Sequence, residues 1–272
     1  MTPIYFTKMH GAGNDFIIVD SRRRNLPEDY AVRFAQRQCS RRTGVGADGL
    51  ILLNDDTATD FRMSHYNPDG SRASFCGNGA RCLALFAYRH GIAGREMAFG
   101  ADDGLHHAVI DGQKVRLHMI EPDQFMVHRS ISEYPRTNTL HTIDTGTKHA
   151  VIRSEDVGKE LVEEDGRALR YHSMFQPDGT NVNFVQKTGL SALAIRTYER
   201  GVEAETLACG TGTVAAAVVL ALTDGVTPPV SVHTHGGETL VVDFRQNDTK
   251  ITDVTLTGSA HMVFEGTLGG EL

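Results

Sequence analysis

One short motif occurs twice in the chain, each time directly before an apolar stretch. Cys-Gly-x-Gly is found at 76–79 and again at 209–212. The apolar residues that follow predict helices that begin at Gly77 and Gly210 and end near Gly91 and Gly225. Helices this apolar are normally buried, so each predicts the centre of its own layer of sheet. The offset of 133 residues in a chain of 272 predicts two related halves.

Short β-type runs dominate the remaining sequence. They lie at 4–6, 16–19, 50–53, 107–110, 114–117, 149–152, 181–185, 230–232, 239–244 and 254–256. Turn signals at 111–112 and 235–237 predict hairpins, and closely spaced strands favour antiparallel sheet over alternating βαβ units. Two further helices are expected, one from Pro27 to Gln38 and one with Ser154 as its N-cap. The predicted fold class is α/β (α+β), with few helices.

Composition excludes several classes of protein. The formal net charge of −7 argues against nucleic-acid binding, which needs a concentrated basic face. The first residues show no signal-peptide pattern, and the longest apolar run, 214–222, is too short to cross a bilayer. Four cysteines without a C-x-x-C pair indicate neither a disulfide scaffold nor a zinc site. We therefore expect a cytoplasmic protein with reduced thiols and no membrane partner.

The duplicated motif combines an anion site with a reactive sulfur. Glycines after the cysteine allow a ligand to approach the backbone closely, and a helix N-terminus offers free N–H groups to a carboxylate. The same positive potential favours the thiolate. Two facing copies would hold a carboxylate between helix ends with a sulfur on either side of its α-carbon. This arrangement suits stereoinversion, in which one thiolate removes the α-proton and the opposite thiol supplies another, with no metal or cofactor.

Other interpretations of these residues were weighed. Gly210-x-Gly212-x-x-Ala215 matches the dinucleotide fingerprint, but its surroundings are rich in hairpins rather than βαβ units. A redox pair would cycle through a disulfide, which nothing resembling C-x-x-C supports. Cys39 and Cys82 lack the glycine context and are predicted to be inert core residues. A non-catalytic amino-acid-binding module stays open, although binding alone needs neither sulfur.

Several motifs together resemble those of the diaminopimelate epimerase family over nearly the whole chain. They lie at 8–16, 67–71, 76–82, 181–185, 196–201 and 208–212. The resemblance implies two pseudo-symmetric halves, each a mostly antiparallel, barrel-like sheet wrapped around a central helix. The expected halves are 1–118, completed by 262–272, and 119–261, with the active site between them. It also implies a homodimer and a small-molecule substrate, L,L-diaminopimelate, converted to the meso form for lysine and peptidoglycan synthesis.

The resemblance also assigns roles to individual residues. Cys76 and Cys209 would be the acid/base pair, with Cys209 the base for the L,L form and Cys76 the proton donor. Amides that bind the reacting carboxylate would come from Gly77, Asn78, Gly210 and Thr211. The substrate would be held by Asn14, Asn67, Asn181, Glu199 and Arg200. His149 and Glu199 would have auxiliary roles. These residue types suit an amino-acid substrate, because Arg200 can bind a carboxylate bidentately and Glu199 can pair with an ammonium.

The chain departs from the family pattern at two places. The family commonly has Gly-Asn-Pro-His where this sequence has Thr147 and Lys148 before His149. Gly49 stands where some members carry a substrate-contacting glutamine. Both Gly49 and Thr147 are therefore weaker candidates for substrate contact. The change at Thr147 and Lys148 leaves open a cofactor-independent racemase of another amino acid on the same fold.

Overall fold

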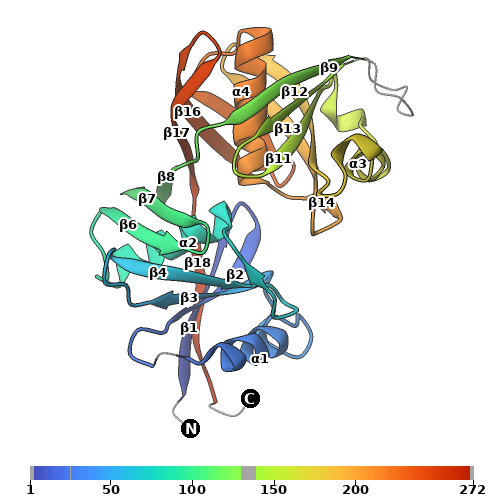
Figure 1. Cartoon of the computed structure of the whole chain (residues 1–272). Coiled ribbons are helices and arrows are strands. Elements are labelled where there is room, and N and C mark those ends of the chain that lie inside the picture. Colours follow the sequence, from blue (N-terminus) through green and yellow to red (C-terminus); the bar gives the residue numbers. More distant parts are fainter. Residues whose placement is uncertain (1–2, 25, 130–138, 270–272) are drawn as a thin grey trace. The chain divides into compact units, whose positions relative to one another are not determined.

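The computed structural model describes residues 3–24, 26–129 and 139–269 of the chain (Figure 1). It divides into two compact units. The first contains Met1–Leu117 and Gly258–Leu272, and the second contains His118–Thr257. The C-terminal segment thus returns to the N-terminal unit, where strand β18 (His261–Leu268) pairs antiparallel with β1 (Ile4–Gly11).

Each unit combines two α-helices with a set of strands. The first unit has α1 (Glu28–Gln38) and α2 (Gly77–Arg89). Besides β1 and β18, its strands are β2 (Asn14–Asp20), β3 (Gly49–Asn54), β4 (Phe61–Tyr66), β5 (Arg72–Ala73), β6 (Glu96–Ala101), β7 (Gly104–Asp111) and β8 (Lys114–His118). The second has α3 (Val162–Arg170) and α4 (Gly210–Asp224), with the 3₁₀ helices η1 (Val157–Lys159) and η2 (Ser173–Phe175). Its strands are β9 (Asp123–Arg129), β10 (Thr139–Asp144), β11 (Lys148–Arg153), β12 (Asn181–Gly189), β13 (Ala192–Glu199), β14 (Ala204–Thr206), β15 (Val230–Thr234), β16 (Thr239–Asn247) and β17 (Lys250–Ser259).

The strands pair in the same order in both units. In the first, β1–β2 is antiparallel, β2–β3 parallel, β3–β4 antiparallel and β4–β6 parallel. In the second, β10–β11, β11–β12, β12–β13 and β13–β15 repeat that sequence of directions. The connections repeat too, because α1 and α3 follow β2 and β11 while α2 and α4 follow β5 and β14. The prediction of two pseudo-symmetric, mostly antiparallel α+β halves is therefore confirmed.

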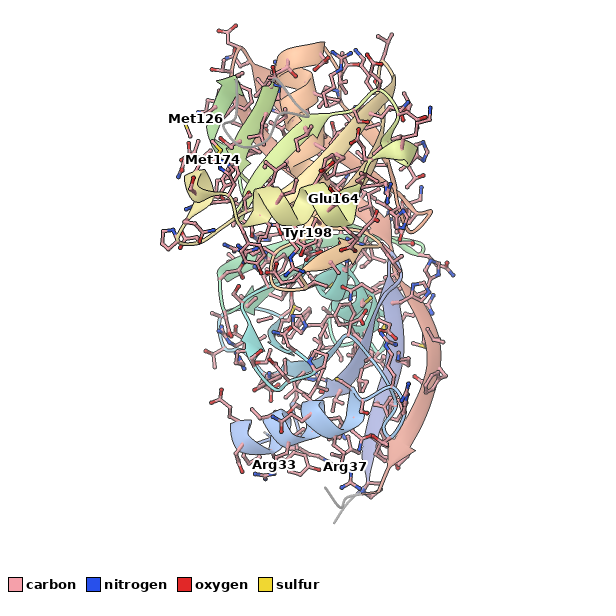
Figure 2. All side chains as sticks on the ribbon, turned by 90° about the vertical axis from the view of Figure 1, so that its right-hand side faces the viewer. Arg33, Arg37, Met126, Glu164, Met174 and Tyr198 are labelled. Carbon is pink, nitrogen blue, oxygen red and sulfur yellow. The ribbon has the colours of Figure 1, made fainter. Side chains whose placement is uncertain are left out.

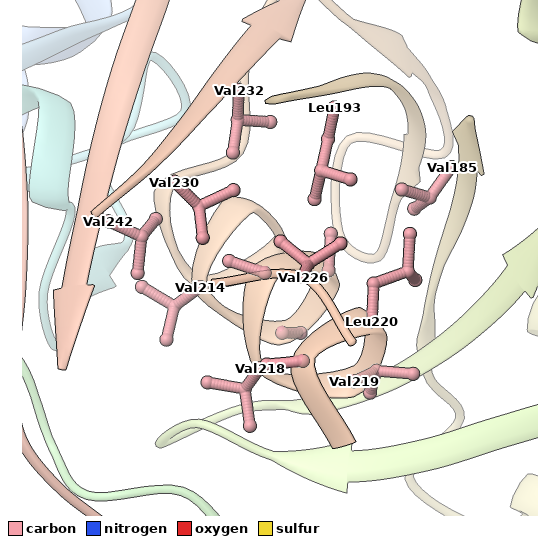
Figure 3. Packing of buried hydrophobic residues seen from close by; sticks show 14 of the residues in the cluster. Val185, Leu193, Val214, Val218, Val219, Leu220, Val226, Val230, Val232 and Val242 are labelled. Carbon is pink, nitrogen blue, oxygen red and sulfur yellow. The ribbon is translucent and has the colours of Figure 1, made fainter. Parts of the chain in front are cut away.

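Helix α4 forms the core of the second unit. Its side chains from Gly212 to Ala221 are all buried. Val214, Val218 and Leu220 pack against aliphatic side chains from the surrounding strands, including Val230 and Val242 (Figure 3). A helix that is apolar on every side must be enclosed in this way, because any exposed face would leave apolar surface in water. Helix α2 is buried in the same manner from Asn78 to Ala87.

The other two helices lie on the outside of their sheets. Helix α1 buries Phe34 and Ala35, whereas Arg33 and Arg37 point away into solvent (Figure 2). In the second unit, α3 lies over Tyr198 of β13 and keeps Glu164 exposed (Figure 2). Gly166 permits this close approach, because a Cβ there would lie 2.4 Å from the Cβ of Tyr198.

Most of the elements expected from sequence are confirmed, and one helix start is wrong. Ser154 does not cap a helix, since its hydroxyl bonds to Glu160 Oε1 at 2.5 Å. Asp156 instead accepts from Gly158 N and stabilises the short turn of η1, which delays α3 until Val162. Strands such as β4, β6, β13 and β18 were not predicted, because polar residues interrupt their apolar pattern. None of the helices in the described ranges is both long and apolar enough to span a bilayer.

Candidate active site

The first half-site gathers around the start of α2. Cys76 is the N-cap residue of this helix, with extended backbone angles (φ −144°, ψ 116°). Its Sγ lies 3.7 Å from Oδ1 of Asn14, the first residue of β2. Asn78 donates from Nδ2 to the same oxygen at 3.3 Å. Three residues that the sequence singled out therefore lie in contact within one unit.

An ionic network anchors Asn14 from the other side. Its Nδ2 donates to Asp48 Oδ2 at 2.8 Å, and Asp48 pairs through Oδ1 with Arg41 at 2.6 Å. Asp15 joins the network through Arg41 at 2.9 Å and Lys8 at 2.8 Å. Burial raises the pKa of Asp15, but hydrogen bonds from Arg41 and Lys8 outweigh it and lower that pKa to about 2. The Asp15 carboxylate therefore stays ionised, and the network holds the side chain of Asn14 in one place.

A fully buried arginine anchors Asn78. Arg81 follows it by one helical turn and donates from one guanidinium nitrogen to Asn78 Oδ1 at 2.8 Å. Further guanidinium nitrogens reach the carbonyl oxygens of Gly77 at 3.5 Å and Ser259 at 3.4 Å. Sequence reasoning gave Arg81 no role. The signal was an arginine inside an otherwise apolar helix, where a charge needs polar partners.

The second half-site gathers around the start of α4. Cys209 is again the N-cap residue in an extended conformation (φ −117°, ψ 116°), and it is buried. Its Sγ lies 3.5 Å from the hydroxyl oxygen of Thr211. The hydroxyl of Thr213 donates to the carbonyl of Cys209 at 2.8 Å, and that of Thr145 donates to the carbonyl of Thr211 at 3.1 Å. The first turn of this helix is thus fixed by hydroxyl groups.

Asn183 connects the base of α4 to His149. Its Oδ1 accepts from the Thr197 hydroxyl at 3.0 Å, so its Nδ2 must be the donor to His149 Nδ1 at 3.0 Å. The neutral ring therefore carries its proton on Nε2, which has no hydrogen-bond partner in the described part of the chain. Burial, helped by the positive charge of Arg200, lowers the pKa of His149 to about 3. The sequence had not singled out Asn183, although a polar residue inside an apolar strand was the signal.

The polar residues at the ends of β12 and β13 lie together. Oδ1 of Asn181 accepts the backbone N–H of Arg200 at 2.8 Å, which joins the start of β12 to the end of β13. Glu199 is largely buried, and this burial raises its pKa although the Thr206 hydroxyl donates to it at 2.8 Å. A guanidinium nitrogen of Arg200 donates to the carbonyl of Asp178 at 3.3 Å. An amide, a carboxyl and a guanidinium are therefore grouped at the ends of these two strands.

The weaker candidates occupy different surroundings. Lys148 forms an ion pair with Asp178 at 2.8 Å, so an acidic neighbour balances the cation that departs from the family pattern. The backbone carbonyl oxygen of Thr147 accepts a hydrogen bond from the backbone N–H of Thr145. Asn67 donates to the Ser71 hydroxyl at 3.0 Å across a turn.

Gly49 lies against the ring of His65 on the neighbouring strand. A Cβ at position 49 would lie 2.6 Å from His65 Nε2. The imidazole therefore fills the space that a larger side chain at position 49 would need.

The two glycines of each motif differ in their surroundings. A Cβ on Gly77 would meet nothing within 4 Å, whereas one on Gly79 would lie 2.6 Å from Ile51 Cδ1. In the second copy a Cβ on Gly210 would approach Leu256 at 3.1 Å, but one on Gly212 would collide with Asn183 Oδ1 at 2.4 Å. The second glycine of each motif thus lets the helix start lie close on its sheet.

The remaining cysteines are core residues, as predicted. Cys39 and Cys82 are buried, and neither forms a disulfide. Burial raises the pKa of Cys39 to about 12, which keeps its thiol protonated and unreactive. Within the described ranges, no three His, Cys, Asp or Glu residues are grouped as metal ligands.

His65 should make the protein labile to acid. Neither ring nitrogen has a hydrogen-bond partner among the described residues, and burial, with a smaller effect of Arg72, lowers the pKa of His65 to about 4. An unfolded histidine binds a proton near pH 6.5, so stability is lost as the pH falls from there towards 4. We expect His65→Leu to reduce the fall in unfolding free energy between pH 7 and 4.5 by about 2 kcal/mol in urea titrations. Equal pH dependence in both proteins would contradict this account.

Two solved structures share this architecture. A phenazine biosynthesis protein of the PhzF family from Bacillus anthracis matches with a TM-score of 0.77 at 14% identity, over 98% of this chain and 99% of that one. A hydroxyproline epimerase from Agrobacterium vitis matches with a TM-score of 0.69 at 15% identity, over 98% and 92%. The fold is therefore the two-half fold that these proteins share.

Sequence comparison is more specific. The family model for diaminopimelate epimerase matches residues 6–122 and 141–263. Diaminopimelate epimerases of Aquifex aeolicus and Chlorobaculum tepidum are each 42% identical, over 98% and 96% of this chain and 98% and 99% of their own lengths. The chain belongs to the diaminopimelate epimerase family, a family of isomerases, which confirms the resemblance found in its motifs.

Proposed function

We propose that the chain interconverts L,L- and meso-diaminopimelate for lysine and peptidoglycan synthesis, by moving an α-proton between Cys76 and Cys209. Membership of the family supports the substrate and the reaction. One structural observation supports the mechanism. Each half of the chain places a cysteine as the N-cap of a buried helix, whose N-terminal backbone N–H groups are suited to bind a carboxylate.

The reaction needs one base and one acid. A thiolate takes the α-proton, and the electron pair of the broken C–H bond moves into the carboxylate, which becomes an enediolate. The N–H groups at Gly77, Asn78, Gly210 and Thr211 stabilise the charge on its oxygens. The thiol of the other cysteine then donates its proton to the opposite face of the carbon, so the two sulfurs exchange protonation states. We assign the base for the L,L form to Cys209, with no cofactor or metal in any step.

The surrounding polar groups hold the substrate in this proposal. Arg200 would bind a carboxylate and Glu199 an ammonium, whose positive charge would favour the ionised form of the buried carboxyl. His149, held neutral by burial, would offer its Nε2 proton as a donor. Asn14 and Asn181 would contact the substrate through side-chain atoms that also form hydrogen bonds within the protein. Asn67, Gly49 and Thr147 remain peripheral candidates.

Deuterium incorporation from solvent tests the substrate. With diaminopimelate and the common amino acids incubated in D₂O, we expect deuterium to enter the α-position of diaminopimelate alone. Exchange into another amino acid and not diaminopimelate would favour the alternative, a racemase on the same fold. Tight binding of an amino acid without exchange would instead indicate a non-catalytic binding protein.

We also propose that the chain works as a cytoplasmic homodimer. None of the four cysteines, all of which lie in the described ranges, forms a disulfide, and a two-thiol mechanism requires a reducing compartment. The β1–β18 ribbon exposes Tyr5 (70%), Val263 (56%) and Phe264 (46%), apolar surface that a second copy could cover. Sedimentation equilibrium should give twice the chain mass, and Phe264→Asp should shift the protein to the monomer.

A further inference from the structure

We infer that Asp48 is a positioning residue that keeps Cys76 in its protonated form, by fixing the direction in which the Asn14 amide points. The inference rests on the proposed two-thiol mechanism and concerns the state of one thiol before substrate binds. The Asn14 amide bonds to Asp48 on one side and lies against Cys76 Sγ on the other. Asp48 acts through Asn14, which lies between them.

The orientation of the Asn14 amide is determined at both ends. A carboxylate only accepts hydrogen bonds, so the contact with Asp48 Oδ2 at 2.8 Å must come from Asn14 Nδ2. At the other end lies Asn78, whose own amide is oriented by Arg81. A guanidinium only donates, so Asn78 Oδ1 faces Arg81 and Asn78 Nδ2 faces Asn14. Both constraints turn Oδ1 of Asn14 towards Cys76.

A carbonyl oxygen in this position distinguishes the two states of the sulfur. Asn14 Oδ1, at 3.7 Å from Cys76 Sγ, can accept a proton from the S–H group but can only repel a thiolate. It therefore opposes the helix N-terminus, which by itself favours the thiolate. The orientation makes Cys76 an acid in the free protein.

The second half-site lacks this restriction. Cys209 Sγ lies 3.5 Å from the hydroxyl of Thr211, and a hydroxyl can either donate to a thiolate or accept from a thiol. The helix N-terminus favours the thiolate at Cys209. Two copies of one motif thus start the reaction in different protonation states because their neighbours differ.

The ionisable groups near Asn14 do not override this effect. They are Lys8, His10, Asp15, Arg41, Asp48, His65 and Arg81. Lys8 and Arg41 are paired with Asp15, and Arg41 also with Asp48, so their charges are locally balanced. His65 is neutral above pH 4 because of its burial.

Alkylation by iodoacetamide as a function of pH tests the inference in the full chain without substrate. Trypsin cleaves after Arg81, between Cys76 and Cys82, so mass spectrometry reads Cys76 and Cys209 on separate peptides. We expect Asp48→Ala to release the Asn14 amide. At pH values below the midpoint of the Cys76 profile, alkylation of Cys76 should then be about ten times faster. The Cys209 profile should not move. Asp55→Ala, an exposed carboxylate of the same unit, is the control for the lost charge and should leave both profiles unchanged.

A double variant separates positioning from direct electrostatic repulsion. Asn14→Leu removes the carbonyl and leaves Asp48 paired with Arg41, so it too should speed Cys76 alkylation at low pH. It also provides the test if Asp48→Ala fails to fold. In the Asn14→Leu background, Asp48→Ala should add no further change. Three results would overturn the inference. They are a full effect of Asp48→Ala in that background, no effect of either single variant, and equal shifts at both cysteines. Because alkylation needs no turnover, these outcomes are separate from failure of the proposed epimerase activity.

Discussion

Replacement of either Cys76 or Cys209 by alanine is expected to abolish epimerisation, with kcat lowered by roughly a thousandfold or more, the range for loss of a general acid or base. Inversion requires proton removal from one face of the α-carbon and delivery to the other. Neither sulfur can do both, because each half of the chain supplies one cysteine at one helix start. The measurement is the rate of conversion of L,L-diaminopimelate to the meso form, and of the meso form back to L,L-diaminopimelate.

The matched control is Cys39→Ala, which removes a buried thiol outside both half-sites and should retain activity. Thermal unfolding must show that each variant is folded, since Cys209 is itself buried. Cys76→Ala removes a partly exposed side chain that makes no cap hydrogen bond, so it should change stability little. Full activity in either cysteine variant would rule out the two-base mechanism.

The features that the sequence predicted well are those specified locally. Helices α2 and α4 are each defined by an apolar run and by a glycine at the C-terminal end, Gly91 with φ 64° and Gly225 with φ 63°. A positive φ at such a position costs glycine little, so the helix ends can be read from residues that are neighbours in sequence. The wrong helix start at Ser154 shows the limit of local reasoning, because a competing carboxylate two residues later stabilises a different turn.

The features that the sequence missed depend on contacts between distant residues. Asp48 lies 34 residues from the asparagine that it anchors, and Asn183 lies 34 residues from His149. A polar residue inside an apolar run, such as Arg81 or Asn183, can be noticed locally, but the local pattern does not show which distant residue it contacts. Strand β13 was missed for the same reason, since Arg196 and Thr197 obscure its apolar alternation but are satisfied by Glu205 and Asn183 in the fold.

Substitution of Arg81 is expected to have the largest effect on stability. Arg81→Ala should lower the unfolding free energy by about 3–5 kcal/mol, because it leaves a void in the core and an unsatisfied oxygen on buried Asn78. Urea unfolding followed by circular dichroism measures the change. Arg89→Ala, on the exposed end of the same helix, is the control and should cost no more than about 0.5 kcal/mol.

A second substitution shows whether the volume or the hydrogen bonds of Arg81 matter more. Arg81→Met fills much of the same space without a donor, so any loss that remains reports the unpaired oxygen of Asn78. If the hydrogen bond orients Asn78, Arg81→Met should also speed Cys76 alkylation at low pH, since Asn78 can then turn and no longer fixes Asn14. Full stability together with an unchanged Cys76 profile would show that the buried arginine is replaceable by apolar volume. Arg81 would then have no part in setting the state of the thiol.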